Sequence, residues 1–165
     1  MGVLTRELLG AVRANFALDW HGIHGAPHWA RVRLNGLAIA TRTGARTDVV
    51  ELFAFLHDSC RLSDGGDRDH GRRAAAFAHK LRGKAFHLDD RGFELLAHAC
   101  ETHSDGHREG DPTVQACWDA DRLDLWRVWI DVDPRRLATG VAREKRLFEE
   151  ARGRAVGWRA RMARR

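Results

Sequence analysis

The sequence predicts an all-α protein, a single-domain bundle of about seven helices. Apolar residues recur at the spacing of amphipathic helices along most of the chain. Strand signals are scarce, because there is no Tyr and no Asn-Gly or Asp-Gly turn lies between two β-branched runs. With 165 residues, 44% of them apolar, the chain is long enough to bury one hydrophobic core without disulfides.

The three prolines mark places where helices begin. Pro27, Pro112 and Pro134 each suit the first helical position, and Asp111 and Asp133 precede the last two as helix caps. The prolines therefore separate helices and interrupt none. We expect helices at residues 3–18, 27–43, 47–61, 69–82, 89–103, 111–129 and 134 to about 160.

Two glycines and two polar loops mark the ends of some of these helices. Gly44 and Gly83 follow helical segments, where glycine readily takes the left-handed conformation that ends a helix. The polar stretches 62–68 and 104–111 follow two further helices. Loops of this kind often form the walls of a substrate-binding site.

The positive charge is concentrated at the C-terminal end. Residues 143–165 hold nine Arg or Lys and three Glu, whereas residues 1–142 hold 19 basic and 20 acidic residues. We therefore divide the chain into a helical body, 1–142, and a basic helix or tail, 143–165, packed on or extending from the same domain. Such a tail can contact nucleic acid, but a solvated terminal helix is its commoner role. Nucleic acid is thus a minor alternative partner, through the tail only.

The cysteines and the first residues favour a soluble, cytoplasmic protein with no membrane partner. Cys60, Cys100 and Cys117 lack CxxC spacing and stand in apolar or helical contexts, which is typical of buried thiols. The first residues lack the charged and apolar regions of a signal peptide. No run of about eighteen apolar residues occurs that could span a membrane.

Three short motifs place His and Asp residues in a particular order. The motifs are His28-Trp29-Ala30-Arg31-Val32, Leu56-His57-Asp58 and Asp119-Ala120-Asp121-Arg122-Leu123. The His-Asp pair alone has little meaning, because ten His and fifteen Asp in 165 residues produce about one such pair by chance. The whole ordered set resembles the HD-domain superfamily of metal-dependent phosphohydrolases. This resemblance implies an HD-domain-like helical fold and a metal held by His28, His57, Asp58 and Asp121.

The chemistry of these residues is consistent with a metal site. Val49, Val50, Phe53 and Leu56 form an apolar stripe, and the next residue, His57, follows Phe53 by four positions on the core-facing side. The neighbouring carboxylate would then be buried, which requires a hydrogen-bonding partner or a cation. Two imidazoles with two carboxylates suit an octahedral Mn, Fe, Co or Mg ion better than a closed structural zinc.

Three carboxylates compete for the position of the last ligand. Asp119 and Asp121 lie about 200° apart on a helix and cannot face the same point. Asp124 is the third candidate. The resemblance selects Asp121, and Asp119 is the alternative.

Two further histidines could hold a second metal ion. The resemblance implies this role, because some superfamily members use two His between the His-Asp pair and the last Asp. His70 and His103 occupy these places in the order, although either could be a polar cap or loop residue. We therefore expect one or two divalent ions per chain. The remaining histidines are expected to be structural or exposed: His21, His24, His79, His87, His98 and His107.

The chain departs from nucleotidase-like and (p)ppGpp hydrolase-like relatives after the His-Asp pair. Those relatives often place a carboxylate three or four residues later, where this chain has Arg61. On a continuing helix Arg61 would project one turn beyond His57 and could bind a phosphate. Asp64 could handle protons. The alternative is a surface role for both, with Arg61 paired to Asp64 or Asp67.

These patterns predict a metal-dependent phosphohydrolase that acts on a small phosphorylated metabolite or nucleotide. A bound divalent ion would supply hydroxide near neutral pH and neutralise charge on a phosphoryl oxygen. The chain has no P-loop, no Rossmann glycine pattern and no nucleophile elbow. Two alternatives are an HD-fold di-iron oxygenase and a non-catalytic, metal-binding regulatory module. The sequence assigns no oligomeric state.

Overall fold

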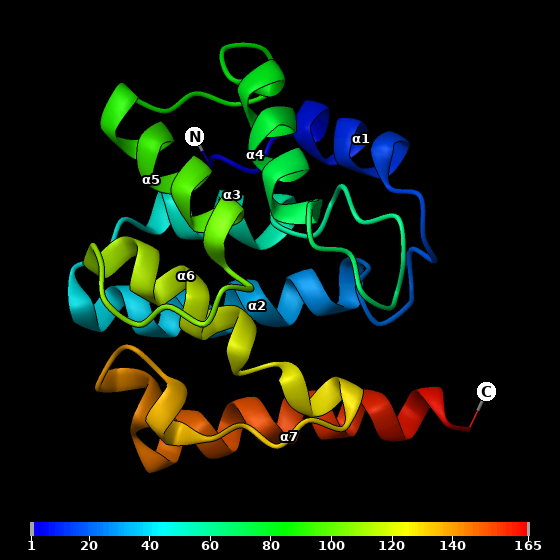
Figure 1. Cartoon of the computed structure of the whole chain (residues 1–165), viewed down its shortest axis with the longest axis vertical. Coiled ribbons are helices and arrows are strands. Elements are labelled where there is room, and N and C mark those ends of the chain that lie inside the picture. Colours follow the sequence, from blue (N-terminus) through cyan, green and yellow to red (C-terminus); the bar gives the residue numbers. More distant parts are fainter. Residues whose placement is uncertain (1, 165) are drawn as a thin grey trace.

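The computed structural model describes residues 2–164 as helices joined by loops and short 3₁₀ turns (Figure 1). Within this range there are seven α-helices and no strand, apart from an isolated bridge between Arg82 and Phe86. The predicted all-α fold is therefore confirmed. The α-helices are α1 (Arg6–Asn15), α2 (Ala26–Thr43), α3 (Thr47–Leu56), α4 (His70–Leu81), α5 (Asp90–Thr102), α6 (Pro112–Arg122) and α7 (Lys145–Met162). The 3₁₀ turns are η1 (Leu125–Val128), η2 (Pro134–Arg136) and η3 (Val141–Arg143).

Helix α3 lies inside the bundle, between the other helices (Figure 1). It packs against α2, α5 and α6, while α4 packs mainly on α5. Helix α7 runs along the edge opposite α1 and α4, where it packs on η1 and α2. The helices that carry the motif residues therefore meet around the C-terminal end of α3.

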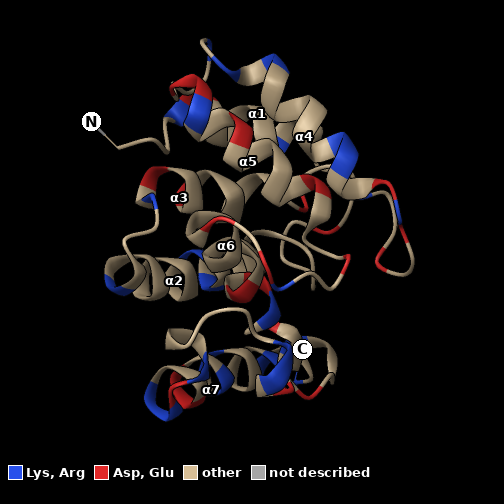
Figure 2. Ribbon diagram, turned by 60° about the vertical axis from the view of Figure 1, so that its left-hand side comes forward, with Lys and Arg blue, Asp and Glu red and all other residues tan. Residues whose placement is uncertain are grey.

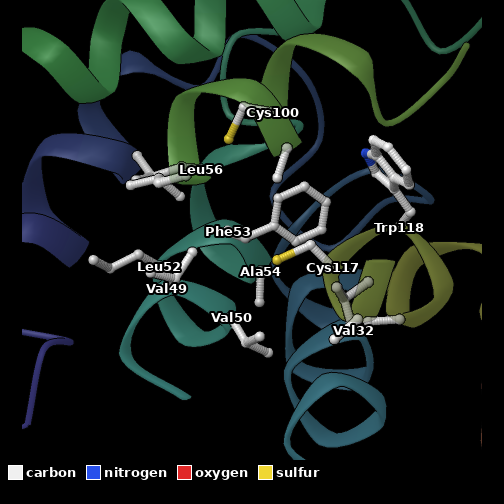
Figure 3. Close-up of a cluster of buried hydrophobic side chains, with 14 of the residues drawn as sticks. Val32, Val49, Val50, Leu52, Phe53, Ala54, Leu56, Cys100, Cys117 and Trp118 are labelled. Atoms are coloured by element: carbon white, nitrogen blue, oxygen red, sulfur yellow. The ribbon is translucent and has the colours of Figure 1, made fainter. Parts of the chain in front are cut away.

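The core is built around the apolar surface of α3 (Figure 3). Phe53 is fully buried, with Cys100 of α5 and Trp118 of α6 in the same cluster. Burial raises the pKa of the Cys100 and Cys117 thiols, so both stay protonated and unreactive. All three cysteines are free, and Cys60 is only half-buried. The buried residues of α3 are Val49, Val50, Leu52, Phe53, Ala54 and Leu56.

Two glycines allow helices that carry site residues to approach each other closely. A Cβ on Gly36 of α2 would lie 2.4 Å from Val50 Cγ1 of α3 and 3.3 Å from Ala120 Cβ of α6. A Cβ on Gly71 of α4 would lie 2.4 Å from the carbonyl oxygen of Cys100 in α5. Both helix crossings therefore require glycine.

Three helix ends differ from the prediction by five residues or more. Helix α3 ends at Leu56 and not at 61, α6 ends at Arg122 and not at 129, and α7 begins at Lys145 and not at 134. Between α6 and α7 the chain forms the three 3₁₀ turns. Trp129, with a φ of 65°, ends η1 in the left-handed conformation. Gly44, with a φ of 73°, ends α2 in the same way, as expected.

The irregular path after α6 has an identifiable cause. The buried carboxylate of Asp119 accepts hydrogen bonds from the amides of Ala138 (2.8 Å) and Thr139 (2.7 Å). These bonds draw the chain back onto α6. A helix running through 138 and 139 would use the same amides in its own hydrogen bonds. Pro134 therefore begins a turn of only three residues, capped by Asp133 as predicted.

The basic C-terminal segment forms α7, along which Lys and Arg are numerous (Figure 2). An apolar stripe of this helix packs on the body. Leu147, Ala151, Ala155 and Trp158 are its buried residues. Arg159 donates a hydrogen bond to the carbonyl of Trp126 in η1 (2.8 Å). Within residues 2–164, no helix combines the length and apolar character needed to cross a membrane.

Candidate metal centre

Six of the side chains predicted as metal ligands meet in one cluster around the end of α3. They come from five helices or their ends, and all are buried except for Asp121, whose side chain is 15% exposed. The six are His28 in α2, His57 and Asp58 directly after α3, His70 at the start of α4, His103 at the end of α5, and Asp121 in α6.

The first part of the cluster, here the α2–α6 half, consists of His28, His57 and Asp121. His28 Nε2 lies 3.2 Å from His57 Nε2 and 3.3 Å from Asp121 Oδ1. His57 Nε2 lies 3.7 Å from the same carboxylate oxygen. Asp58 faces this half with Oδ2, at 3.6 Å from His28 Nε2 and 3.7 Å from His57 Nε2.

The second part, here the α4–α5 half, consists of His70 and His103. Their Nε2 atoms are 2.8 Å apart. Asp58 Oδ1 faces them, at 3.2 Å from His70 Nε2 and 3.6 Å from His103 Nε2. One carboxylate thus presents an oxygen to each half, which is the arrangement of a bridging ligand.

In each of the four imidazoles, the hydrogen bond formed by Nδ1 leaves Nε2 facing the cluster. All four Nδ1 atoms contact oxygens that can only accept, so each Nδ1 carries the proton and each neutral ring directs the lone pair of Nε2 inward. Converging lone pairs repel one another unless a cation lies between them, and this donor set fits a divalent metal. The acceptors are Asp124 Oδ2 for His28 (2.7 Å), Phe53 O for His57 (3.1 Å), Cys100 O for His103 (2.7 Å) and Asp67 O for His70.

The charges of the cluster also favour a cation. Burial works against ionisation of Asp58 and Asp121, but the surrounding imidazoles hold the pKa of each carboxyl well below its usual range. Burial lowers the pKa of His28. For His57, the two carboxylates outweigh the larger single effect of burial and raise the pKa. The cluster therefore attracts positive charge at the point where the Nε2 atoms meet.

Asp124 lies on the opposite side of His28 from Asp121. Besides accepting from His28 Nδ1, its carboxylate accepts from Arg31 Nε (2.6 Å) and Nη2 (2.9 Å). The Arg31 guanidinium in turn lies over the ring of Trp158 in α7, with Cζ 4.6 Å from the ring centroid. Asp124 therefore orients a ligand ring and does not face the cluster.

Asp119 faces away from the cluster, toward the segment after η2. The structure thus brings Asp121, and not Asp119, to the predicted ligands, as their angular separation on one helix requires. Thr139 Oγ1 donates a third hydrogen bond to Asp119 (2.8 Å).

His24 is a site residue that the sequence analysis did not identify. It was expected to be structural or exposed, yet it is buried and its Nδ1 lies 2.9 Å from Asp58 Oδ2. It stands in the turn before α2, where helical periodicity gives no signal. The available signal was its position four residues before His28.

Arg61 contacts the cluster by a route that the sequence analysis did not predict. Because α3 ends at Leu56, Arg61 does not continue the helical face of His57. Its Nε donates to Asp58 Oδ1 (3.0 Å), and its Nη1 donates to the carbonyls of Ser63 (3.1 Å) and Gly65 (3.2 Å). The alternative pairing with Asp64 or Asp67 does not form.

A cavity of about 880 Å³ opens beside the cluster. Asp58, Asp121 and His103 line it, together with His24 and Arg61. Both polar loops predicted as walls contribute to its lining, through Asp64 on one side and Ser104, Gly106 and Arg108 on the other. The exposed Asp64 forms no hydrogen bond or ion pair with the metal-ligand candidates.

The chain is similar over nearly its whole length to the crystal structure of a predicted HD superfamily hydrolase from an uncultured Thermotogales bacterium. The two are 27% identical, with a TM-score of 0.68, and the match covers 96% of this chain and 90% of that one. No protein-family model matches the chain, and no curated protein matches it. The structural match confirms the resemblance predicted from the three motifs and supports a hydrolase.

Proposed function

We propose that this HD-like chain is a metal-dependent phosphohydrolase that holds two divalent ions and hydrolyses a small phosphorylated metabolite or nucleotide. The observation that supports it most strongly is the convergence of four imidazole Nε2 atoms on the two oxygens of Asp58. The α2–α6 half would hold one ion and the α4–α5 half the other. The nitrogen and oxygen donors suit Mn, Fe, Co or Mg.

Ions at this position would activate water near neutral pH and neutralise charge on a phosphoryl oxygen. In the net reaction a water oxygen bonds to phosphorus, the ester P–O bond breaks, and the released alcohol takes a proton. Arg61 is close enough to Asp58 to contact a phosphate bound at the cluster, where its guanidinium would stabilise the anion. Asp64, in the cavity wall, would handle the proton of the leaving alcohol. His24 would orient Asp58 Oδ2.

The first test measures metal content and phosphate release together. Elemental analysis of the purified protein should find two divalent ions per chain, and Mn or Co should stimulate release of phosphate from a panel of phosphorylated metabolites and p-nitrophenyl phosphate. Asp58→Ala should remove both ions and all turnover, because it deletes the ligand shared by the two halves. Circular dichroism confirms that the variant is folded.

Three outcomes would contradict the proposal in different ways. Wild-type metal content in Asp58→Ala would show that the ligand assignment is wrong. Two redox-active irons with substrate-dependent oxygen uptake, and no phosphate release, would identify the oxygenase alternative. Tightly bound metal without turnover of any compound in the panel would favour a regulatory module.

A further inference from the structure

Five arginines line the cavity beside the metal centre, and they divide into two groups. Arg61 bonds to Asp58, and Arg127 is buried with its Nε donating to the carbonyl of Ile23 (2.6 Å), next to Asp124. These two arginines serve the cluster itself. The other three are Arg108, Arg122 and Arg136.

The second group comes from three separate segments that its own hydrogen bonds tie together. Arg122, the last residue of α6, donates to the carbonyl of Arg136 (3.2 Å) and to the carbonyl of His107. Arg108, in the loop after α5, donates to the carbonyl of Arg135 (2.7 Å). These bonds hold the loop 104–111 and the turn η2 against the end of α6.

The acceptors of these hydrogen bonds carry no charge, and the three arginines have only one ion pair in the described range, a long one between Arg122 and Asp119. Main-chain carbonyls are neutral, and the carboxylate nearest to Arg122, that of Asp119, lies 3.7 Å away and already accepts three hydrogen bonds. Arg136 forms no hydrogen bond or ion pair through its side chain with any other residue in the described range 2–164. A guanidinium presents several N–H donors in a planar fork that matches phosphate and carboxylate.

The carboxylates that line the cavity form no ion pair with these three arginines. Asp58 and Asp121 belong to the metal centre, and Asp133 is paired with Arg135, which does not line the cavity. Only Asp64 and Asp131 remain, and both are exposed, as are Arg108 and Arg136. The five aspartates that line the cavity equal its five arginines in number, so bound divalent ions would give the cavity a net positive charge.

The wall also includes aliphatic side chains, and the cavity is large enough for a small metabolite. The aliphatic residues are Ile23, Leu125, Val128, Ile130, Val132 and Leu137. They can contact the carbon skeleton of a ligand whose polar groups are held at other points.

We propose that the substrate carries a second anionic group, a phosphate or a carboxylate, which Arg108, Arg122 and Arg136 bind while the scissile phosphate occupies the metal centre. This proposal rests on the proposed function for the identity of the first group. It narrows the substrate class to phosphorylated metabolites with two separate anionic centres.

The test compares phosphate esters that differ in their second group, using the Mn-loaded protein. Glycerol 3-phosphate has no second anion, 3-phosphoglycerate has a carboxylate, and fructose 1,6-bisphosphate has a phosphate. The two-anion compounds should have kcat/KM values at least about tenfold higher, the gain expected for a charge-assisted contact. Comparing the carboxylate with the phosphate shows which anion the arginines prefer.

Arg136→Gln should lower kcat/KM about tenfold for the preferred two-anion compound, mainly through KM, and leave glycerol 3-phosphate unchanged. Arg6→Gln is the matched control, because it removes the same charge from an exposed residue of α1 that does not line the cavity. The control variant should leave kcat/KM unchanged for both classes of substrate. Equal losses on both classes in Arg136→Gln, or equal losses in the two variants, would overturn the proposal.

Calorimetric binding of fructose 1,6-bisphosphate separates this proposal from the proposed function. Binding that Arg136→Gln weakens about tenfold and Arg6→Gln leaves unchanged would support the arginine subsite even without phosphate release. In that case only the hydrolase assignment fails. Phosphate release from glycerol 3-phosphate with no preference for two-anion compounds would instead retain the hydrolase and reject the subsite.

Discussion

His28 and Asp121 lie within α2 and α6, whereas His70 is the first residue of α4 and His103 follows the last residue of α5. In the α2–α6 half, His28 is fixed by a carboxylate that an arginine holds in turn. In the α4–α5 half, both rings are fixed by main-chain carbonyls beside polar loops. Charged acceptors form stronger hydrogen bonds than neutral ones, and helix ends open more readily than helix interiors. We therefore expect the α2–α6 half to bind its ion more tightly.

Among the variants that test this difference between the two halves, Gly71→Ala should have the largest effect. The added Cβ would collide with the carbonyl of Cys100 and push α4 away from α5, which separates His70 from His103. Metal content after dialysis should fall from two ions per chain to one, and the free energy of unfolding in urea should drop by about 1–3 kcal/mol.

Gly10→Ala is the control for this variant. Gly10 lies in α1 with open space around it, so alanine should keep both ions and raise the stability by up to about 1 kcal/mol. A Gly71→Ala protein that keeps two ions would show that the α4–α5 half does not depend on this helix crossing.

Asp124→Asn should weaken the tighter ion. The substitution keeps the size of the side chain but removes the charge that fixes His28 and pairs with Arg31. We expect the dissociation constant of the tighter ion, measured by competition with a chelator, to rise about 10- to 100-fold.

Asp119→Asn is the control, because it changes another buried carboxylate, which contacts only the segment after η2 and the end of α6. It should lower stability and leave the metal affinity unchanged, and a similar loss of affinity in both variants would remove the special role of Asp124.

The smallest effect is expected from Asp48→Asn, at the start of α3 and outside both halves. Arg46 pairs with Asp48 (2.7 Å) and holds the pKa of that carboxyl below its usual range. The pair is about one-third exposed, so its loss should cost only about 0–1 kcal/mol at neutral pH. Because the folded pKa is lowered, this contribution is complete above the unfolded pKa of about 3.9 and disappears as the pH falls through the folded value.

Urea unfolding of wild type and Asp48→Asn at several pH values measures this difference. The two proteins should converge in acid, and both should bind two ions at neutral pH. A stability difference that grows as the pH falls would have the wrong sign for a lowered pKa.

The same contrast between helix interiors and irregular segments explains how much the sequence could predict. The ligand series stands at helix positions or directly beside them, and the family resemblance of its ordered motifs was sufficient to predict which side chains meet. The long helices expected at 111–129 and from 134 were wrong. Hydrophobic periodicity gives no information on the hydrogen bonds that the carboxylate of Asp119 accepts from the amides of Ala138 and Thr139. Arg108 and Arg136 of the cavity wall lie on the loop after α5 and on this irregular segment, and they gave no pattern in the sequence.

Two site residues show what spacing alone misses. Asp121 and Asp124 were treated as competitors for one role, but they occupy the two sides of one imidazole, at Nε2 and Nδ1 of His28. Their three-residue separation places both near the same ring, and only the fold shows which nitrogen each one faces. His24 was missed because it stands in a turn, where neither helical nor strand periodicity applies.

The contact between Arg31 and Trp158 has a consequence for the order in which the protein matures. During synthesis, the residues of α2 leave the ribosome long before those of α7, and upstream segments can begin to fold first. Arg31 reaches its final position over Trp158 only after α7 has emerged and docked. The series of contacts behind His28, through Asp124 and Arg31 to Trp158, is therefore complete only in the finished chain.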